Sequence, residues 1–273
     1  MIVREPCLPP GWYPRNPGKI SRFLTNCSGA AGEPAAAAIA PHAGWFYSGR
    51  IAAAAVSALN RDADTVVVAG GHLPAGAPPL FAEEGGVRTP LGIMPIDTEL
   101  RTLLQGEIGG REDRYRDNTV EVLLPMVHFF LPQAKLLWLR LPADMDSLET
   151  GKRIAGAAAS LGRKLAVLGS TDLTHYGDNY IFSPHGRGEK ALRWVRELND
   201  RAFIEAVEVG NPEKILERAE TDRSSCSAGA VLCALGYAQA LGRPRPRLLA
   251  YGTSADAEDE VPGSFVGYAA FSL

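Results

Sequence analysis

Short, mostly apolar runs alternate along this chain with longer stretches in which apolar residues recur every three or four positions. A strand covered on both faces needs no polar alternation, so the short runs predict buried strands. They lie at residues 35–40, 64–69, 135–141, 165–170, 247–251 and 265–271. The longer stretches predict helices. They lie at residues 47–60, 98–105, 120–130, 148–161, 189–209, 212–219 and 228–241.

Strands that alternate with helices are typical of α/β folds, in which helices cover both faces of a largely parallel sheet. We therefore expect a three-layer α/β/α architecture. The last two strands follow each other closely and need not be parallel, so the sheet is expected to be mixed. Because no long linker interrupts the alternation, residues 1–273 are expected to form one domain.

Segments rich in proline and glycine lie outside these elements. Residues 1–34 read as an irregular opening segment, with a loop at residues 28–32, and residues 71–95 predict a loop and a hairpin. Pro125 is expected to kink the helix that contains it. Asn211, followed by a proline and a glutamate, predicts a capped helix start.

Composition and charge then narrow the functional classes. The chain is 46% hydrophobic and 22% charged with a net charge of −3, which offers no broad positive field, so no nucleic-acid partner is expected. The chain has no apolar run of membrane-spanning length and no signal-peptide core, so we expect a cytoplasmic protein without a membrane partner. Its four cysteines show neither zinc-finger spacing nor a disulfide framework, and thiols are expected.

Three of the five histidines follow predicted strands. His42 lies between the strand at 35–40 and a helix, His72 follows the strand at 64–69, and His175 follows the strand at 165–170. The carboxyl ends of parallel strands are where open α/β sheets bind ligands. Each histidine alone would more often be structural, but the three together predict one shared site.

Asp172 and Cys226 extend this candidate site. Asp172 precedes His175 by three residues and either orients its imidazole for acid–base chemistry or caps a turn. Cys226 precedes a predicted helix, whose N-terminus would favour a thiolate; a small core residue is the alternative, as expected for Cys233. Imidazole with thiolate is a donor set for iron, copper or zinc.

Other aromatic side chains lie near these residues in the sequence. Tyr47 and Tyr176 closely follow candidate histidines and are expected to offer phenolic hydrogen bonds. Tyr251 and Tyr268 are expected to be packing residues, and His128 is expected to be structural or solvent-facing on its helix.

Motifs along nearly the whole chain resemble the Memo family. The most specific is Pro-His-Ala-Gly at residues 41–44 with Tyr-Ser-Gly at residues 47–49, followed by Gly-His at residues 71–72. The further matches are Arg-Glu-Pro at 4–6, Gly-Trp-Tyr-Pro at 11–14, Arg-Thr-Pro-Leu-Gly at 88–92, Ser-Thr-Asp-Leu-Thr-His-Tyr-Gly at 170–177, Tyr-Gly-Thr-Ser at 251–254 and Val-Gly-Tyr-Ala-Ala at 266–270.

This resemblance implies a fold similar to class III extradiol ring-cleavage dioxygenases, which are non-haem iron enzymes. By family likeness, His42, His72 and Cys226 would hold a metal, with iron or copper expected ahead of zinc. Asp172 and His175 would lie in the same pocket as catalytic groups. Bacterial and archaeal members often accompany a radical-SAM protein, which is an implied partner, and one eukaryotic member is described as a signalling adaptor.

The chain departs from the family pattern at two places. Asn118 and Leu123 stand where the family commonly has histidines, although Glu121 and Pro125 of the same motif remain. Cys226 is followed by serine and alanine rather than by glycine and then proline. The fold inference is unaffected by these changes, whereas the inferred reaction and substrate depend on them.

Three functional hypotheses follow. The first is a metal-dependent oxidoreductase or dioxygenase-like protein acting on a small molecule. The second is a hydrolase with Cys226 as nucleophile, His175 as base and Asp172 orienting that base. The third is a non-enzymatic module that binds a ligand or a peptide through a degenerate metal site.

Overall fold

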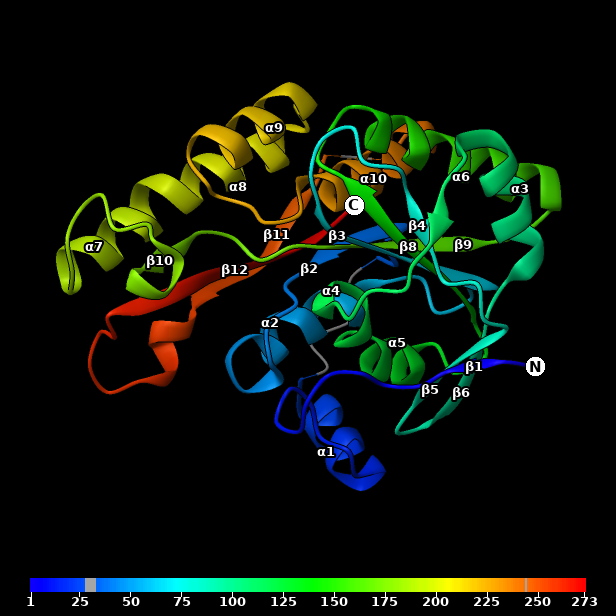
Figure 1. Cartoon of the computed structure of the whole chain (residues 1–273), viewed down its shortest axis with the longest axis horizontal. Coiled ribbons are helices and arrows are strands. Elements are labelled where there is room, and N and C mark those ends of the chain that lie inside the picture. The colour runs from blue at the N-terminus through cyan, green and yellow to red at the C-terminus, as the bar shows by residue number, and fades with distance from the viewer. Residues whose placement is uncertain (28–32, 244) are drawn as a thin grey trace.

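A central sheet runs through the computed structural model, which describes residues 1–27, 33–243 and 245–273 (Figure 1). Within these residues, nine strands form the main sheet in the order β10-β12-β2-β9-β3-β8-β4-β7, with β11 paired to β12. The strands are β2 (Ala37–Ala40), β3 (Thr65–Leu73), β4 (Leu80–Phe81), β7 (Arg111–Glu112), β8 (Lys135–Pro142), β9 (Leu165–Ser170), β10 (His175–Gly177), β11 (Arg247–Thr253) and β12 (Ser264–Ser272).

The centre of this sheet is parallel and its flanks are antiparallel. Strands β2, β9, β3 and β8 run parallel to one another, whereas β12 is antiparallel to β2 and β4 is antiparallel to β8. The expected mixed α/β sheet is therefore confirmed. Ala40 pairs with Ser170, and Ala69 pairs with Gly169, so the chain leaves β2, β9 and β3 at one edge of the sheet.

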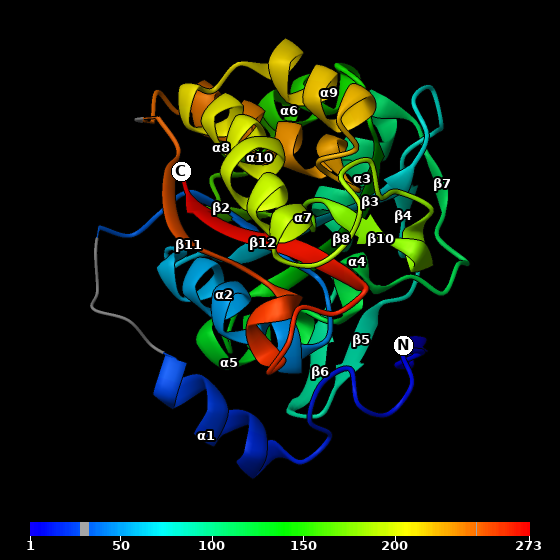
Figure 2. The same cartoon turned by 90° about the vertical axis from the view of Figure 1, so that its left-hand side faces the viewer.

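Helices cover both faces of the sheet, as Figures 1 and 2 show. The helices on one face are α3 (Thr98–Ile108), α6 (Asp146–Leu161), α8 (Asp200–Val209), α9 (Pro212–Thr221) and α10 (Ala228–Ala240). Those on the other face are α1 (Pro17–Cys27), α2 (Trp45–Ala58), α4 (Asn118–Glu121) and α5 (Leu124–Phe130). In β3, Val67 packs with the first group while Val66 and Val68 pack with the second, which explains the unbroken apolar run.

None of the helices in the described ranges combines the length and the apolar character needed to cross a lipid bilayer.

The opening segment contains more structure than expected. Strand β1 (Val3–Arg4) pairs with β5 (Gly86–Thr89), which forms the predicted hairpin with β6 (Gly92–Pro95). Helix α1 also lies in this segment and buries Ile20 and Leu24, whose spacing of four residues is helical. The expectation of an irregular segment was therefore wrong, while the loop expected at residues 28–32 lies outside the described residues.

Two predicted helices are interrupted. The helix expected at residues 120–130 is two short helices, and Pro125 lies in the first turn of α5 rather than at a kink. The helix expected at residues 189–209 consists of α7 (Glu189–Trp194), a π-helical turn at Val195–Asn199 and α8. The predicted start of α9 is confirmed, because the Asn211 side chain accepts a hydrogen bond from the Lys214 amide at 2.8 Å.

Candidate metal centre

Two imidazoles and one thiol converge at the edge of the sheet where β2, β9 and β3 end. His42 follows β2, His72 is the residue before the last of β3, and Cys226 lies in the loop before α10. One possible ligand atom from each of these residues lies within 4.8 Å of the others. Cys226 Sγ is 3.2 Å from His42 Nε2, and the centres of the two imidazole rings are 5.1 Å apart. The three residues therefore form a possible metal-binding group.

The backbone of β3 makes this convergence sterically feasible. A Cβ on Gly71 would lie 2.4 Å from Ser227 Cβ, so only glycine lets this strand approach the loop that carries Cys226. The next residue, His72, has a φ of 59°, a left-handed conformation that is uncommon for residues other than glycine. Such backbone strain tends to occur at functional sites.

His42 is fixed on several sides. Its Nδ1 lies 2.8 Å from Ser170 Oγ, and its backbone N–H donates to Asp172 Oδ1 at 2.7 Å. Its carbonyl accepts a hydrogen bond from the Asn118 side chain at 2.9 Å. Asn118, at one of the two positions where the resemblance implies a histidine, therefore supports the His42 backbone, whereas Leu123, at the other, is buried in the core. His42 is 1% exposed.

A carboxylate and an arginine lie behind His72. Its Nδ1 is 2.9 Å from Asp117 Oδ2, and the same oxygen lies 3.2 Å from a guanidinium nitrogen of Arg140. Arg140 also donates to the Gly71 carbonyl at 3.0 Å and pairs with buried Asp113 at 3.2 Å. A carboxylate that accepts from one ring nitrogen leaves the other nitrogen available for a metal.

Cys226 does not lie in the first turn of a helix. Helix α10 begins at Ala228 with Ser227 as its N-cap, so the expected effect of the helix N-terminus is replaced by contacts with other side chains. The Cys226 amide donates to the Asp172 carbonyl at 3.3 Å, and its sulfur faces His42. Cys233, by contrast, is fully buried in the core, as expected.

Charge pairing governs the protonation of the three donors. Burial alone would raise the pKa of the Cys226 thiol, but His42 and His72 lower this pKa well below its usual value. Burial alone would lower the pKa of His72, yet hydrogen bonds to Asp117 and Cys226 raise it to about 10. The pKa of His42 is likewise raised, because Asp172 and Cys226 outweigh the effect of burial. A thiolate paired with imidazolium is therefore favoured in the metal-free site.

Asp172 and His175 lie at the same edge but do not form the expected hydrogen-bonded pair. Asp172 bonds to the backbone of His42, and its Oδ2 is 3.9 Å from His42 Nε2. His175 Nδ1 instead lies 3.0 Å from the Leu173 carbonyl, and its ring packs edge-on against Tyr180 with centres 4.8 Å apart. Burial raises the pKa of Asp172, although the nearby His42 opposes this effect.

These residues line a cleft of about 730 Å³. His42, His72, Asp172 and His175 contribute to its wall. Aromatic side chains complete it, and these are Trp12, Tyr47, Tyr180 and Tyr268. The volume suits a small-molecule ligand.

The aromatic expectations have mixed outcomes. Tyr176 is buried and makes the expected phenolic hydrogen bonds, because its hydroxyl donates to the Gly186 carbonyl at 3.0 Å and accepts from the His185 amide at 2.9 Å. Tyr268, expected only to pack, lines the cleft. Trp12 and Tyr180 were not predicted; Trp12 lies in a motif that carried the family resemblance, whereas nothing in the sequence singles out Tyr180. His128 contacts Thr89 at 2.7 Å and is structural, as expected.

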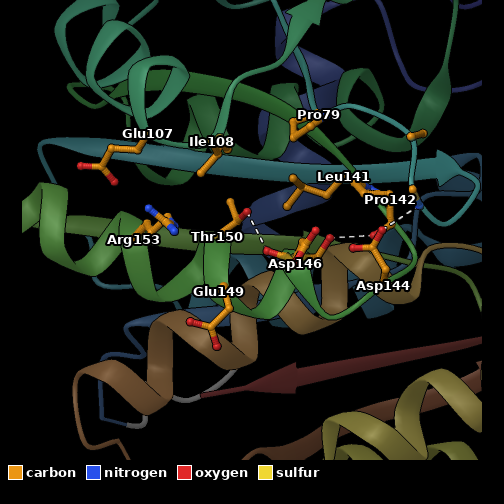
Figure 3. A pocket seen from close by; sticks show the side chains of 13 residues that line it. Pro79, Glu107, Ile108, Leu141, Pro142, Asp144, Asp146, Glu149, Thr150 and Arg153 are labelled. Atoms are coloured by element: carbon orange, nitrogen blue, oxygen red, sulfur yellow. Dashed lines mark hydrogen bonds between the residues drawn. The ribbon is translucent and has the colours of Figure 1, made fainter.

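A second cavity, of about 320 Å³, lies between α3, α6 and the end of β8 (Figure 3). Glu107 and Arg153 lie at one end of it, and Pro142 and Asp144 lie at the other. One carboxylate oxygen of Asp144 accepts a hydrogen bond from the Gly76 amide at 2.8 Å. None of the three candidate donors of the cleft lines this cavity, and neither do Asp172 and His175, so its surroundings differ chemically from the cleft.

The donor chemistry of His42, His72 and Cys226 fits a transition metal. Two imidazoles and one thiolate are donors that iron, copper and zinc accept. The carboxylate behind His72 is the kind of outer partner that orients metal-binding imidazoles. Two of the three donors, His42 and His72, line the cleft, so a molecule in the cleft would lie beside the metal position.

Comparisons with known proteins show which family the chain resembles. The sequence profile described as "Memo-like protein" matches residues 4–272. A MEMO1 family protein of Methanococcoides burtonii is 29% identical over 278 residues, covering 98% of each chain. Another, from Pyrococcus abyssi, is 30% identical over 252 residues, covering 87% of this chain and 86% of its own length.

A solved structure of an uncharacterized Escherichia coli protein is more distant. It covers 86% of this chain and 98% of its own, at 12% sequence identity and a TM-score of 0.44. The family profile, in contrast, spans nearly all of the sequence and includes every residue of the cleft described above. This chain therefore belongs to the Memo family.

Proposed function

We propose that this protein binds one iron or copper ion through His42, His72 and Cys226 and performs redox chemistry on a small molecule. The observation that carries the proposal is the approach of three donor atoms to within 4.8 Å of one another beside a cleft of small-molecule size. A bound iron or copper ion would supply one-electron redox chemistry that side chains alone do not provide.

His175 and Asp172 would manage protons beside the metal. The Leu173 carbonyl can only accept a hydrogen bond, so Nδ1 of neutral His175 carries the proton and Nε2 can accept another. Burial raises the pKa of Asp172, which is the direction that an acid requires, although the nearby His42 opposes this shift. The two groups therefore suit opposite roles, with His175 as base and Asp172 as acid.

The test is a calorimetric titration of reduced, metal-free protein with Fe(II), copper and zinc. We expect about one ion per chain, with affinity that falls as the pH drops because protons compete for the donors. The double variant His42→Ala/His72→Ala should lose this binding. His185→Ala is the matched control, since His185 is exposed and its ring packs at a tilt against Trp194 rather than lining the cleft.

Equal stoichiometry and affinity in the wild type and the double variant would eliminate the proposed ligands. A wild type that binds none of these ions would favour the non-enzymatic binding module instead. Elemental analysis of gently purified protein would identify the metal that the protein carries when isolated.

A Cys226-dependent hydrolase is the second candidate, and the contact of 3.2 Å between Cys226 Sγ and His42 Nε2 favours it. His42, rather than His175, is the imidazole in contact with the thiol, so His42 would serve as the base. Full ester- or amide-hydrolysing activity in the presence of a chelator, and its loss in Cys226→Ser, would favour this candidate over the metal protein.

A further inference from the structure

Two polar residues at the start of α8, Asn199 and Asp200, are buried beneath the candidate site. Asn199 is 5% exposed and Asp200 is 0% exposed. Asn199 is the last residue of a π-helical turn, which is closed by a hydrogen bond from the Asp200 amide to the Val195 carbonyl. Single π-turns within helices are uncommon and often occur at functional sites. Nothing in the proposed chemistry explains why two polar side chains are buried here.

Asp200 holds the turn that carries Asp172 and His175. One oxygen of its carboxylate accepts hydrogen bonds from both the backbone N–H of Thr174, at 3.1 Å, and the Thr174 hydroxyl. The other oxygen accepts from the Tyr251 hydroxyl at 2.8 Å. The whole carboxylate is therefore satisfied by donors, and two of its three bonds go to one residue of the turn.

Asn199 joins this turn to the loop that carries Cys226. Its side-chain amide donates to Thr174 Oγ1 at 2.8 Å and to the Asp222 carbonyl at 2.9 Å. Asp222 ends α9 and begins the loop to Cys226. Asn199 therefore links two segments that are about fifty residues apart in the sequence but meet at the site.

Strand β12 holds the opposite side of the turn. The Leu173 amide donates to the Gly267 carbonyl at 2.8 Å, and the Gly267 amide donates to the Thr174 carbonyl at 3.0 Å. A Cβ on Gly267 would lie 2.0 Å from Asp200 Oδ2, so glycine leaves the space that this carboxylate occupies. The turn is thus clamped between β12 and the start of α8.

We infer that Asn199 and Asp200 are positioning residues for the candidate site, which they act on through Thr174 and the loop after Asp222. The inference rests on the proposed function for its metal readout. Asp172 accepts hydrogen bonds from the backbone amides of His42 and Cys226. A displaced turn would therefore move both of these candidate metal ligands. Asp172 hydrogen-bonds the backbone of these two residues directly, and loss of such a direct partner commonly weakens metal binding by about 10- to 100-fold.

The experiment compares Asp200→Ala, Asp200→Asn and Tyr251→Phe with the wild type. Asparagine keeps an oxygen that can accept from Thr174, so it should rescue the turn. Tyr251→Phe removes only the bond on the far side of the carboxylate and serves as the matched control. We measure Zn²⁺ affinity by calorimetry, hydrogen exchange of the peptide spanning residues 171–175 in metal-free protein, and the melting temperature.

Asp200→Ala should weaken Zn²⁺ binding by about tenfold or more and speed exchange in the turn. Asp200→Asn and Tyr251→Phe should retain near-wild-type affinity and exchange even where their melting temperatures fall. If Asp200→Ala does not fold, Thr174→Val is the substitute variant, because it removes the hydroxyl that joins Asn199 to Asp200. It should likewise weaken Zn²⁺ binding and speed exchange in the turn.

Wild-type Zn²⁺ affinity and wild-type exchange in Asp200→Ala or Thr174→Val would overturn the inference. So would an equal loss of affinity in Tyr251→Phe, because the effect would then follow stability rather than position. A wild type that binds no Zn²⁺ would count against the proposed function alone, and the exchange measurement would then decide the role of the pair.

Discussion

Nδ1 of His72 lies 2.9 Å from Oδ2 of Asp117, and Arg140 lies 3.2 Å from that same oxygen. The carboxylate is thus held between a guanidinium and an imidazole. Burial alone would raise its pKa, but the hydrogen bond with His72 and the charge of Arg140 outweigh burial, so the pKa of Asp117 lies well below its usual value. Asp117 is ionised at neutral pH and fixes which nitrogen of His72 faces the other two donors.

The first prediction concerns this carboxylate. Asp117→Asn should weaken metal binding by about 10- to 100-fold, because a neutral amide orients the imidazole less firmly and makes it a weaker donor. Asparagine can still cap the start of α4, so the fold should persist. Asp178→Asn, in an exposed pair with Arg187, is the control. Calorimetric titration is the measurement, and unchanged affinity in Asp117→Asn would contradict a supporting role.

The sequence predicted the strands, and it placed His42 and His72 at the sheet edge where the structure brings their side chains together. His42 and His72 were accessible to prediction because each follows an apolar run, and parallel strands end at a common edge. Asp117 and Arg140 were not, because neither position carries a local signature. Their roles depend on how the segment before α4 passes beside the end of β3 and β8, which is a property of tertiary packing.

Local patterns also concealed other features. Residues 189–209 have helical spacing on both sides of the π turn, so the sequence predicts one continuous helix. Asn199 and Asp200 look like ordinary surface positions in such a helix, although both are buried. Helix α1 was not predicted, because the prolines and glycines around it indicated an irregular segment despite the helical spacing of Ile20 and Leu24.

The second prediction is a pH dependence of stability that comes from Asp200. Burial raises its pKa from 3.8 to about 6. Between these values the folded state holds a proton that the unfolded state releases, so the free energy of unfolding falls as the pH rises through this window. Relative to Asp200→Asn, the wild type should lose about 1 kcal/mol between pH 5 and pH 8.

Urea unfolding of both proteins at several pH values provides the measurement. Groups other than Asp200 titrate in both proteins, so the difference between the two isolates this carboxyl. A constant difference from pH 5 to pH 8 would show that Asp200 titrates at its usual value, and a change of opposite sign would contradict a raised pKa.

The third prediction concerns Glu121, which is 4% exposed and anchors the segment before α1. Its carboxylate accepts from the Cys7 amide at 2.7 Å, the Leu8 amide at 3.1 Å and the Tyr13 hydroxyl at 2.8 Å. Glu121→Gln should cost about 1–3 kcal/mol, because the amide nitrogen cannot accept and leaves a buried donor without a partner.

Amide exchange distinguishes this anchoring role from a general loss of stability. Faster exchange at Cys7 and Leu8, with unchanged exchange in α10, is the expected result for Glu121→Gln. Gln105→Glu, at an exposed side-chain contact with Glu83, should leave both regions unchanged. Uniformly faster exchange throughout the protein would argue against a local anchor.

The last prediction compares three partly exposed cysteines within one molecule. Imidazoles lower the pKa of Cys226, while burial and the Glu121 carboxylate raise the pKa of Cys7 to about 11, and burial raises that of Cys27. Because the thiolate is the nucleophile, iodoacetamide should modify Cys226 first in metal-free protein at neutral pH. Peptide mass spectrometry measures the three rates in one sample, so unfolding or reagent loss affects all three alike.

One equivalent of a bound metal should then protect Cys226 and leave the slow rates of Cys7 and Cys27 unchanged. Modification of Cys226 at the same rate with and without bound metal would remove this sulfur from the ligand set.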